Sequence, residues 1–177
     1  MFKILLYISL LSSVFFNQNI EYPVPKTKHL LFYIQRNHNE NTIVYDANFD
    51  KDGNLNPKKP VDAYWLRYQE DGRRMELRTF EKYMAYGVKW KKSENPEFDY
   101  RIYLSASKKL VFWLKQTGPF KAEIYADVKG KRFKLDHMFA TLDESGWLPK
   151  VLYGEFFGTD PQTGQKVYIK VYPKDVK

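Results

Sequence analysis

The chain has 177 residues, the size of about one domain, and a formal net charge of +8 from 29 basic and 21 acidic residues. It contains no cysteine, which excludes disulfides, thiolate metal sites and cysteine nucleophiles. Aromatic residues make up 18% of the chain, and since bulky aromatic side chains favour half-buried strands, the composition predicts a β-rich fold.

The first sixteen residues (1–16) are interpreted as a signal peptide whose cleavage site the sequence does not define. Lys3 precedes the apolar run Ile4–Phe16, which has the length of a signal-peptide core and is shorter than the roughly 20 apolar residues of a membrane span. We therefore expect an exported, periplasmic or envelope-associated protein with no stable membrane span after signal removal. A retained N-terminal anchor stays open. Residues 17–28 are a predicted lead-in, and residues 29–174 a single β-domain.

The remaining sequence predicts about nine strands, because runs of alternating or mostly apolar residues are separated by short turn-forming segments. In chain order these runs are residues 30–36, 42–48, 62–68, 98–105, 110–115, 120–128, 133–142, 150–158 and 166–172. The first two are joined by a polar turn at residues 37–41. Hairpin-type links at this spacing predict an all-β, mainly antiparallel fold, either an up-and-down barrel or a sandwich. The barrel is slightly favoured because closure protects sheet edges.

One short helix is expected near residues 76–86. Leu77, Phe80 and Met84 have the spacing of one apolar helix face, and Gly87 follows as a stop signal.

The loop after the second strand resembles a calcium-binding loop. Asn48, Asp50 and Asp52 fit the first, third and fifth positions of an EF-hand, and Gly53 fits the sixth. Lys59, however, occupies the position that requires a bidentate Glu. We therefore interpret the loop as a turn built from turn-forming residues, with calcium at Asn48, Asp50 and Asp52 as the weaker alternative and no cofactor predicted.

Three charged residues interrupt mostly apolar strand segments: Arg36, Asp46 and Arg67. Buried charges are costly unless they are paired. These residues therefore predict a polar cluster, which would be either a structural ion network or a site for a polar group of a ligand. Tyr64 and His137 are further candidate ligand-binding residues, expected to line an aromatic interior.

His137 is predicted to share an apolar strand face with Phe133, Leu135 and Phe139. A single histidine in such surroundings is more typical of a lining residue than of a catalyst, and no catalytic residue is predicted. The three histidines lack zinc-site spacing, and the sequence has no nucleophile-elbow or phosphate-loop motif.

Basic and aromatic residues alternate between Tyr83 and Lys92, a pattern that could suit single-stranded nucleic acid. The expected export argues against that partner, and no nucleic acid is predicted to bind. Elsewhere the basic residues are spread along the chain, which favours a solvated basic surface that attracts anionic partners.

The segments FYIQRNHNENTIVYDAN, PVDAYWLRYQEDG, AYGV and VLYGEFFGTDPQTGQKVYIKV resemble an uncharacterised bacterial family, domain-of-unknown-function family 4833. The resemblance covers about residues 28–174. It implies one intact domain in an exported protein of Gram-negative bacteria, and it implies no catalytic or binding residue.

The first functional hypothesis is a non-enzymatic envelope protein that binds a small or amphiphilic ligand in an aromatic-lined interior. The second is an interaction module that binds an anionic envelope component or a protein partner through a basic, tyrosine-rich face. The third is a hydrolase of unfamiliar type that uses Arg36, Asp46 and Arg67. The sequence predicts no oligomeric state.

Overall fold

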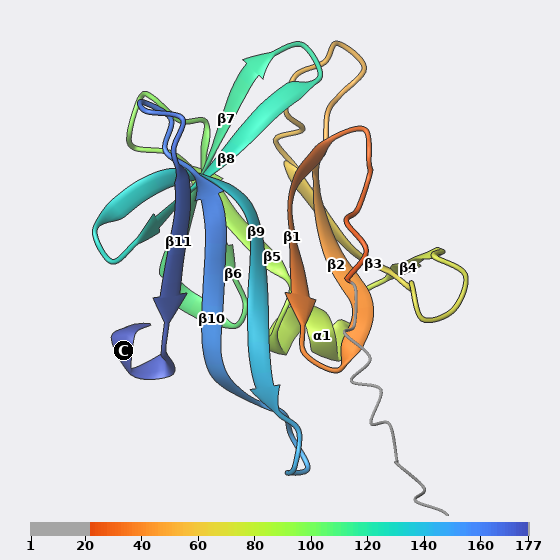
Figure 1. Cartoon of the computed structure of the whole chain (residues 1–177). Coiled ribbons are helices and arrows are strands. Elements are labelled where there is room, and N and C mark those ends of the chain that lie inside the picture. The colour runs from red at the N-terminus through yellow and green to blue at the C-terminus, as the bar shows by residue number, and fades with distance from the viewer. Residues whose placement is uncertain (1–21, 177) are drawn as a thin grey trace, which may run out of the picture.

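The computed structural model describes residues 22–176, so the expected signal peptide and the first part of the lead-in, residues 17–21, lie outside the described residues. Eleven strands form one sheet, accompanied by a short α-helix and a terminal 3-10 helix (Figure 1). In chain order the elements are β1 (Leu30–Arg36), β2 (Asn39–Ala47), β3 (Val61–Leu66), β4 (Arg74–Glu76), α1 (Thr79–Met84), β5 (Val88–Lys92), β6 (Tyr100–Leu104), β7 (Ser107–Gly118), β8 (Lys121–Val128), β9 (Lys131–Asp143), β10 (Lys150–Thr159), β11 (Lys166–Val171) and η1 (Pro173–Val176). The predicted all-β, mainly antiparallel class is confirmed.

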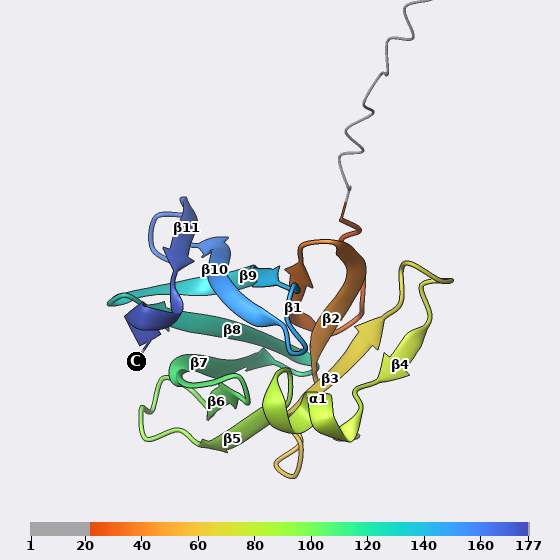
Figure 2. The same ribbon diagram turned by 90° about the horizontal axis from the view of Figure 1, so that it is seen from below.

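Two arms of the sheet attach to one edge of β9. β8 pairs with the first residues of β9, and β1 pairs in parallel with the later residues 137–140. One arm continues through β2 and β3 to β4, and the other through β7 and β6 to β5. The arms curl toward each other until β3 and β5 come into contact, although these two strands are not hydrogen-bonded neighbours (Figure 2). The result is a half-barrel, and its parallel β1–β9 pair departs from simple up-and-down order.

The inner face of the curled sheet is packed with buried side chains. At its centre the ring of Phe32 stacks on Tyr45 at 4.2 Å and on Phe112 at 5.7 Å between ring centroids, and all three residues are fully buried. Burial of apolar area on this scale is the main force that holds such a sheet in its curved form. Because these side chains fill the inner face, the positions open to a ligand are at the rims and on the outer face of the sheet.

A one-residue bulge at Asp136 redirects the side chains of β9. Phe157 of β10 pairs with His137, but the next residue, Gly158, pairs with Leu135, so Asp136 has no partner on β10. An extra residue in a strand moves the following side chains to the opposite face. Leu135 therefore lies in the core, while His137 stacks on Phe157 outside it. The face predicted from alternation is wrong from His137 onward.

The β1–β2 hairpin is tighter than predicted. β2 begins at Asn39, which pairs with Arg36, so only Asn37 and His38 form the turn. His38 has a φ of 58°, a left-handed conformation that is uncommon for a residue other than glycine and allows the chain to reverse within two residues. The five-residue polar turn expected at residues 37–41 is therefore too long.

The helix is shorter than predicted and its apolar face is not buried. α1 has no buried residue, and Phe80 and Met84 are 61% and 60% exposed. Leu77 is buried, but it precedes the first helical turn. The difference arises because α1 crosses the gap between the two arms of the sheet instead of packing on a sheet face.

Candidate functional site

The open seam between β3 and β5 forms a groove of about 500 Å³, within the range of small-molecule sites. α1 lies beside β3 and β5 (Figure 2), and α1 and the residues that flank it contribute to the lining of the groove. The residues that line it are Lys58, Lys59, Val61, Ala63, Glu76, Leu77, Thr79, Lys82, Tyr83, Gly87, Val88, Lys89, Trp90 and Ser105.

The apolar part of the groove comes from both strands. Val61 and Ala63 belong to β3, Val88 and Trp90 to β5, and buried Leu77 lies between them in sequence. The indole Nε1 of Trp90 donates a hydrogen bond of 3.4 Å to the carbonyl oxygen of Pro57. This bond crosses the seam, so it links β5 to the segment before β3.

Four lysines surround this apolar surface, against a single carboxylate, Glu76. Lys59 forms an ion pair with Asp62, and the Nζ atom of Lys82 lies 3.9 Å from the carboxylate of Glu76. Among the described residues, the ion pairs include neither Lys58 nor Lys89. The groove therefore combines an apolar floor with two lysine ammonium groups available to an anion.

The ion pairs beside the groove fix the charge of Asp62. Burial acts to raise the pKa of Asp62, but hydrogen bonds from Lys59 and Arg74 outweigh burial, and the pKa is lowered. Asp62 therefore stays ionised and holds Lys59 at the rim of the groove.

The Glu81 side chain and a close approach of the backbone at Gly87 hold α1 beside the groove. The Glu81 carboxylate accepts hydrogen bonds from the backbone N–H of Arg78 at 2.7 Å and from the Trp65 indole at 3.2 Å. A Cβ atom at Gly87 would lie 1.9 Å from the carbonyl oxygen of Lys82, so only glycine permits this close return of the chain. The predicted helix stop thus also shapes the wall of the groove.

The structure gives Arg36, Asp46 and Arg67 separate surroundings. The guanidinium of Arg36 lies 5.3 Å from the centre of the Trp65 ring, and Arg67 binds Glu70 within the turn after β3 through hydrogen bonds of 2.9 and 2.7 Å. No hydrogen bond or ion pair joins any two of the three charges within residues 22–176.

Asp46 instead connects the lead-in to the outer face of the sheet. Its carboxylate accepts hydrogen bonds from Thr27 at 2.5 Å and from the phenol of Tyr64 at 2.7 Å. Burial, followed by this hydrogen bond to Asp46, raises the pKa of Tyr64. Both side chains serve to hold the lead-in, whose Pro25 is buried, against β2 and β3.

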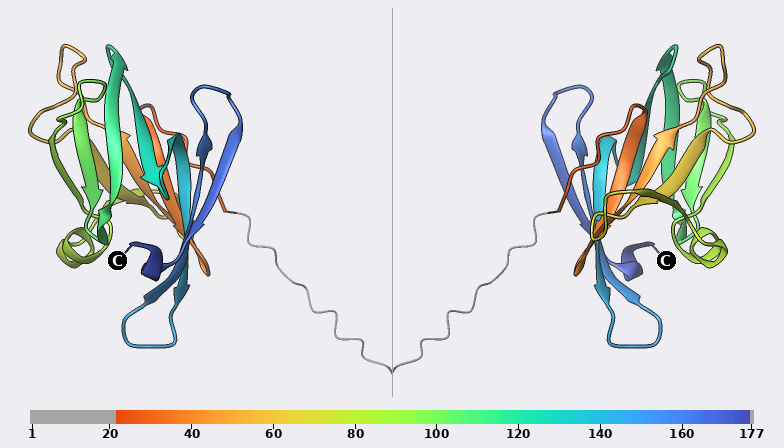
Figure 3. Two further views of the ribbon diagram at one scale, coloured as in Figure 1. Left: turned by 90° about the vertical axis from the view of Figure 1, so that its left-hand side faces the viewer. Right: turned by 90° about the vertical axis from the view of Figure 1, so that its right-hand side faces the viewer.

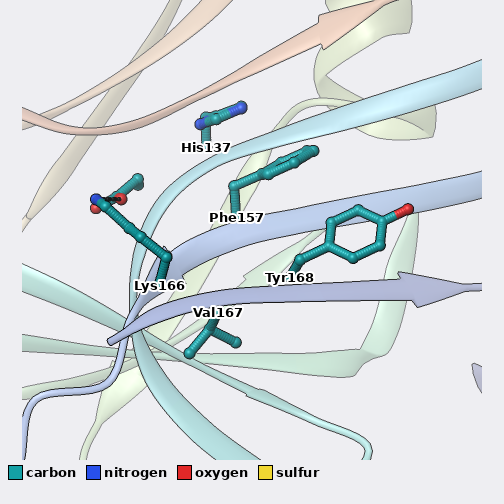
Figure 4. Close-up of a pocket in the computed structure, with 7 residues that line it drawn as sticks. His137, Phe157, Lys166, Val167 and Tyr168 are labelled. Carbon is teal, nitrogen blue, oxygen red and sulfur yellow. Dashed lines mark hydrogen bonds and ion pairs between the residues drawn. The ribbon is translucent and has the colours of Figure 1, made fainter. Parts of the chain in front are cut away.

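His137 belongs to a row of side chains that crosses six strands of the outer face. In register order the row consists of Tyr64, Val44, Tyr33, His137, Phe157 and Tyr168. The imidazole stacks between Tyr33 at 5.0 Å and Phe157 at 4.4 Å. A shallow pocket of about 280 Å³ lies here, with Lys166 and Asp136 3.3 Å apart at its rim (Figure 4).

Residues 32–170 match the family described as "Domain of unknown function (DUF4833)". The chain belongs to the DUF4833 family. No curated protein and no solved structure matches the DUF4833 domain of this chain.

In the calcium-like loop of the DUF4833 domain, the Asp50 side chain forms hydrogen bonds within the loop itself. The Asp50 carboxylate accepts hydrogen bonds from the backbone N–H groups of Asp52 and Asn54, each at 2.9 Å, and the Asn48 amide donates to the carbonyl oxygen of Lys59 at 2.8 Å. Within residues 22–176 there is no group of three or more His, Asp or Glu side chains that could hold a metal ion. The same residues include no helix of the length and apolarity needed to cross a membrane.

His137 gives the DUF4833 domain a testable pH dependence. Burial lowers the pKa of His137, while the nearby Asp136 acts in the opposite direction. The folded state therefore binds this proton less tightly than the unfolded state, and stability falls as the pH decreases below about 6.5. We expect the urea midpoint to fall between about pH 7.5 and about pH 5.5, with a smaller fall for His137→Phe. An identical fall in both proteins would contradict this role.

Sequence reasoning missed the groove. Lys89 and Trp90 lie in the run from Tyr83 to Lys92, where the basic and aromatic pattern was visible, but Lys58 and Lys59 precede β3 and Lys82 lies in α1. That pattern did not show that β5 would leave an open edge opposite β3, since the groove exists only because the two arms of the sheet meet without pairing.

Proposed function

We propose that the DUF4833 domain is a non-enzymatic binding module that works after export, at the cell envelope, and holds an anionic amphiphilic molecule in the groove between β3 and β5. One observation carries the proposal: an apolar floor lies directly beside lysines without an internal ion pair. A ligand with an alkyl chain and an anionic head group matches both parts.

The energetics favour a ligand that uses both parts at once. An alkyl chain over Ala63 and Val88, which line the groove and are only partly buried, would remove apolar surface from water, at about 25 cal/mol per Å². A head group near Lys58 and Lys89 would gain ion pairing in a partly enclosed site, where charges are screened less than in bulk water. The proposal combines the small-ligand and anionic-component hypotheses, and it places the ligand at the seam between β3 and β5 because side chains fill the interior.

The proposal predicts that removal of the two available lysines weakens binding of a defined probe. In calorimetric titrations with dodecyl phosphate, the double variant Lys58→Ala/Lys89→Ala should bind about five- to thirtyfold more weakly than wild type, because each of the two lost ion pairs contributes about 0.5–1 kcal/mol. Inorganic phosphate should bind far more weakly than dodecyl phosphate, since it leaves the apolar floor uncovered.

A matched control distinguishes binding in the groove from non-specific attraction of an anionic probe to a basic protein. The double variant Lys121→Ala/Lys131→Ala removes two exposed lysines on β8 and β9 and changes the net charge equally. It should keep wild-type affinity. Equal weakening in both double variants, or equal affinity for the two phosphates, would disprove the groove as the binding site.

A further inference from the structure

The β9–β10 hairpin extends beyond the rest of the sheet (Figure 3). β1 accompanies β9 only as far as Ala140, and β11 accompanies β10 only from Gly154 onward. Beyond these points β9 and β10 continue to pair with each other as far as Asp143 and Lys150. The end of the hairpin is therefore a two-stranded ribbon with no neighbouring strand on either edge.

The tip of this ribbon exposes large apolar side chains. Trp147 is 94% exposed, the highest value among the exposed large hydrophobic side chains that the structure describes, and Leu148, Val151 and Leu152 are each about half exposed. Contiguous exposed apolar side chains on a protein surface mark a place that another phase or molecule covers. Nothing else in residues 22–176 covers them.

The base of the hairpin is held in a fixed direction. The Asn37 amide donates a hydrogen bond of 3.0 Å to the carbonyl oxygen of Leu142, and the backbone N–H of Leu142 donates one of 2.7 Å to the Asn37 side-chain oxygen. The β1–β2 turn thus clamps the ribbon where it leaves the sheet. A tip held in this way loses little conformational freedom when it is covered.

We propose that the tip of the β9–β10 hairpin inserts into the surface of a lipid bilayer. A stable protein partner buries about 20–30 residues on each side, whereas the tip exposes four large apolar side chains: Trp147, Leu148, Val151 and Leu152. A bilayer interface requires no matching shape, and tryptophan is the side chain best suited to it, with an apolar body and a polar N–H.

The charge of the chain agrees with this partner. The net charge of +8 attracts anionic lipid head groups. Insertion of an apolar tip and attraction of a basic chain to anionic head groups are two weak contributions, and together they give stable attachment. The proposal does not depend on a ligand in the groove.

The test is co-sedimentation of the full chain with vesicles of phosphatidylethanolamine and phosphatidylglycerol. The double variant Trp147→Ser/Leu148→Ser should lower the partition coefficient by about tenfold or more. The control Tyr168→Ser removes an aromatic side chain that is 55% exposed on β11, away from the tip, and should partition as wild type does.

Brominated lipids provide a second readout, which reports insertion of the tip even if the N-terminal run also binds the vesicles. They should quench part of the tryptophan emission of wild type, and Trp147→Phe should still bind while losing that quenched part. Unchanged partition of the double variant, or identical quenching of wild type and Trp147→Phe, would overturn the proposal. So would a double variant that loses self-association instead of vesicle binding, because the tip would then contact a second copy of the chain.

Discussion

Gly158→Ala is expected to destabilise the domain by about 3 kcal/mol. A Cβ atom at Gly158 would lie 2.2 Å from the carbonyl oxygen of Lys134 and 2.5 Å from a ring carbon of Phe133. Phe133 is fully buried, and the backbone of β9 is fixed by its neighbours at this point, so neither contact can relax cheaply. Urea denaturation should show the loss as a lower midpoint with an unchanged slope.

Gly118→Ala is the matched control for this substitution. No atom lies within 4 Å of a Cβ placed at Gly118, and its φ is not among the positive values. Its unfolding free energy should stay within about 0.5 kcal/mol of wild type. If Gly158→Ala were as stable as Gly118→Ala, the close packing of β9 on β10 at the bulge would be incorrect.

Phe112→Ala is expected to cost about 3–5 kcal/mol, the range for removal of a buried phenylalanine. Phe112 is fully buried on β7 and stacks on Phe32 of β1, so its ring joins the two arms of the sheet. A typical domain is stable by only about 5–15 kcal/mol, so the variant should unfold at a much lower urea concentration or fail to accumulate.

The control is Phe80→Ala on α1, where the side chain is 61% exposed. The same chemical change there should alter the unfolding free energy by about 0.5 kcal/mol or less. A small effect at Phe112 would mean that the inner face of the sheet is not the packed core, and a large effect at Phe80 would mean that α1 buries its apolar face.

The strand pattern was predictable where one run of residues carried its own signal. The predicted bounds of the first strand agree with β1 (Leu30–Arg36), because the strand begins with five apolar or aromatic residues and is followed by turn-forming residues. β4 was not predictable, since its three residues pair with β3 and bury no side chain. The position of His137 was not predictable either, because the bulge at Asp136 arises where β9 changes its neighbour from β8 to β1.

The candidate site was less predictable than the fold for the same physical reason. Its groove is formed by segments around Val61, Lys82, Trp90 and Ser105. No local sequence pattern reveals which two strands of a curled sheet will face each other without forming hydrogen bonds. Arg36, Asp46 and Arg67 stood out in sequence because charged residues in apolar strands are costly. In the structure Asp46 and Arg67 bind separate local partners, while the guanidinium of Arg36 lies beside the Trp65 ring and its buried Nε has no hydrogen-bond partner among the described residues.

The seam between β3 and β5 is proposed to bind an anionic amphiphile. The most direct measurement is a crystal structure of the protein with dodecyl phosphate. We expect an alkyl chain lying over Ala63 and Val88, with the phosphate oxygens within hydrogen-bond distance, about 3 Å, of the Lys58 or Lys89 ammonium. A ligand seated beside His137 on the outer face, or an empty groove at a saturating ligand concentration, would contradict it.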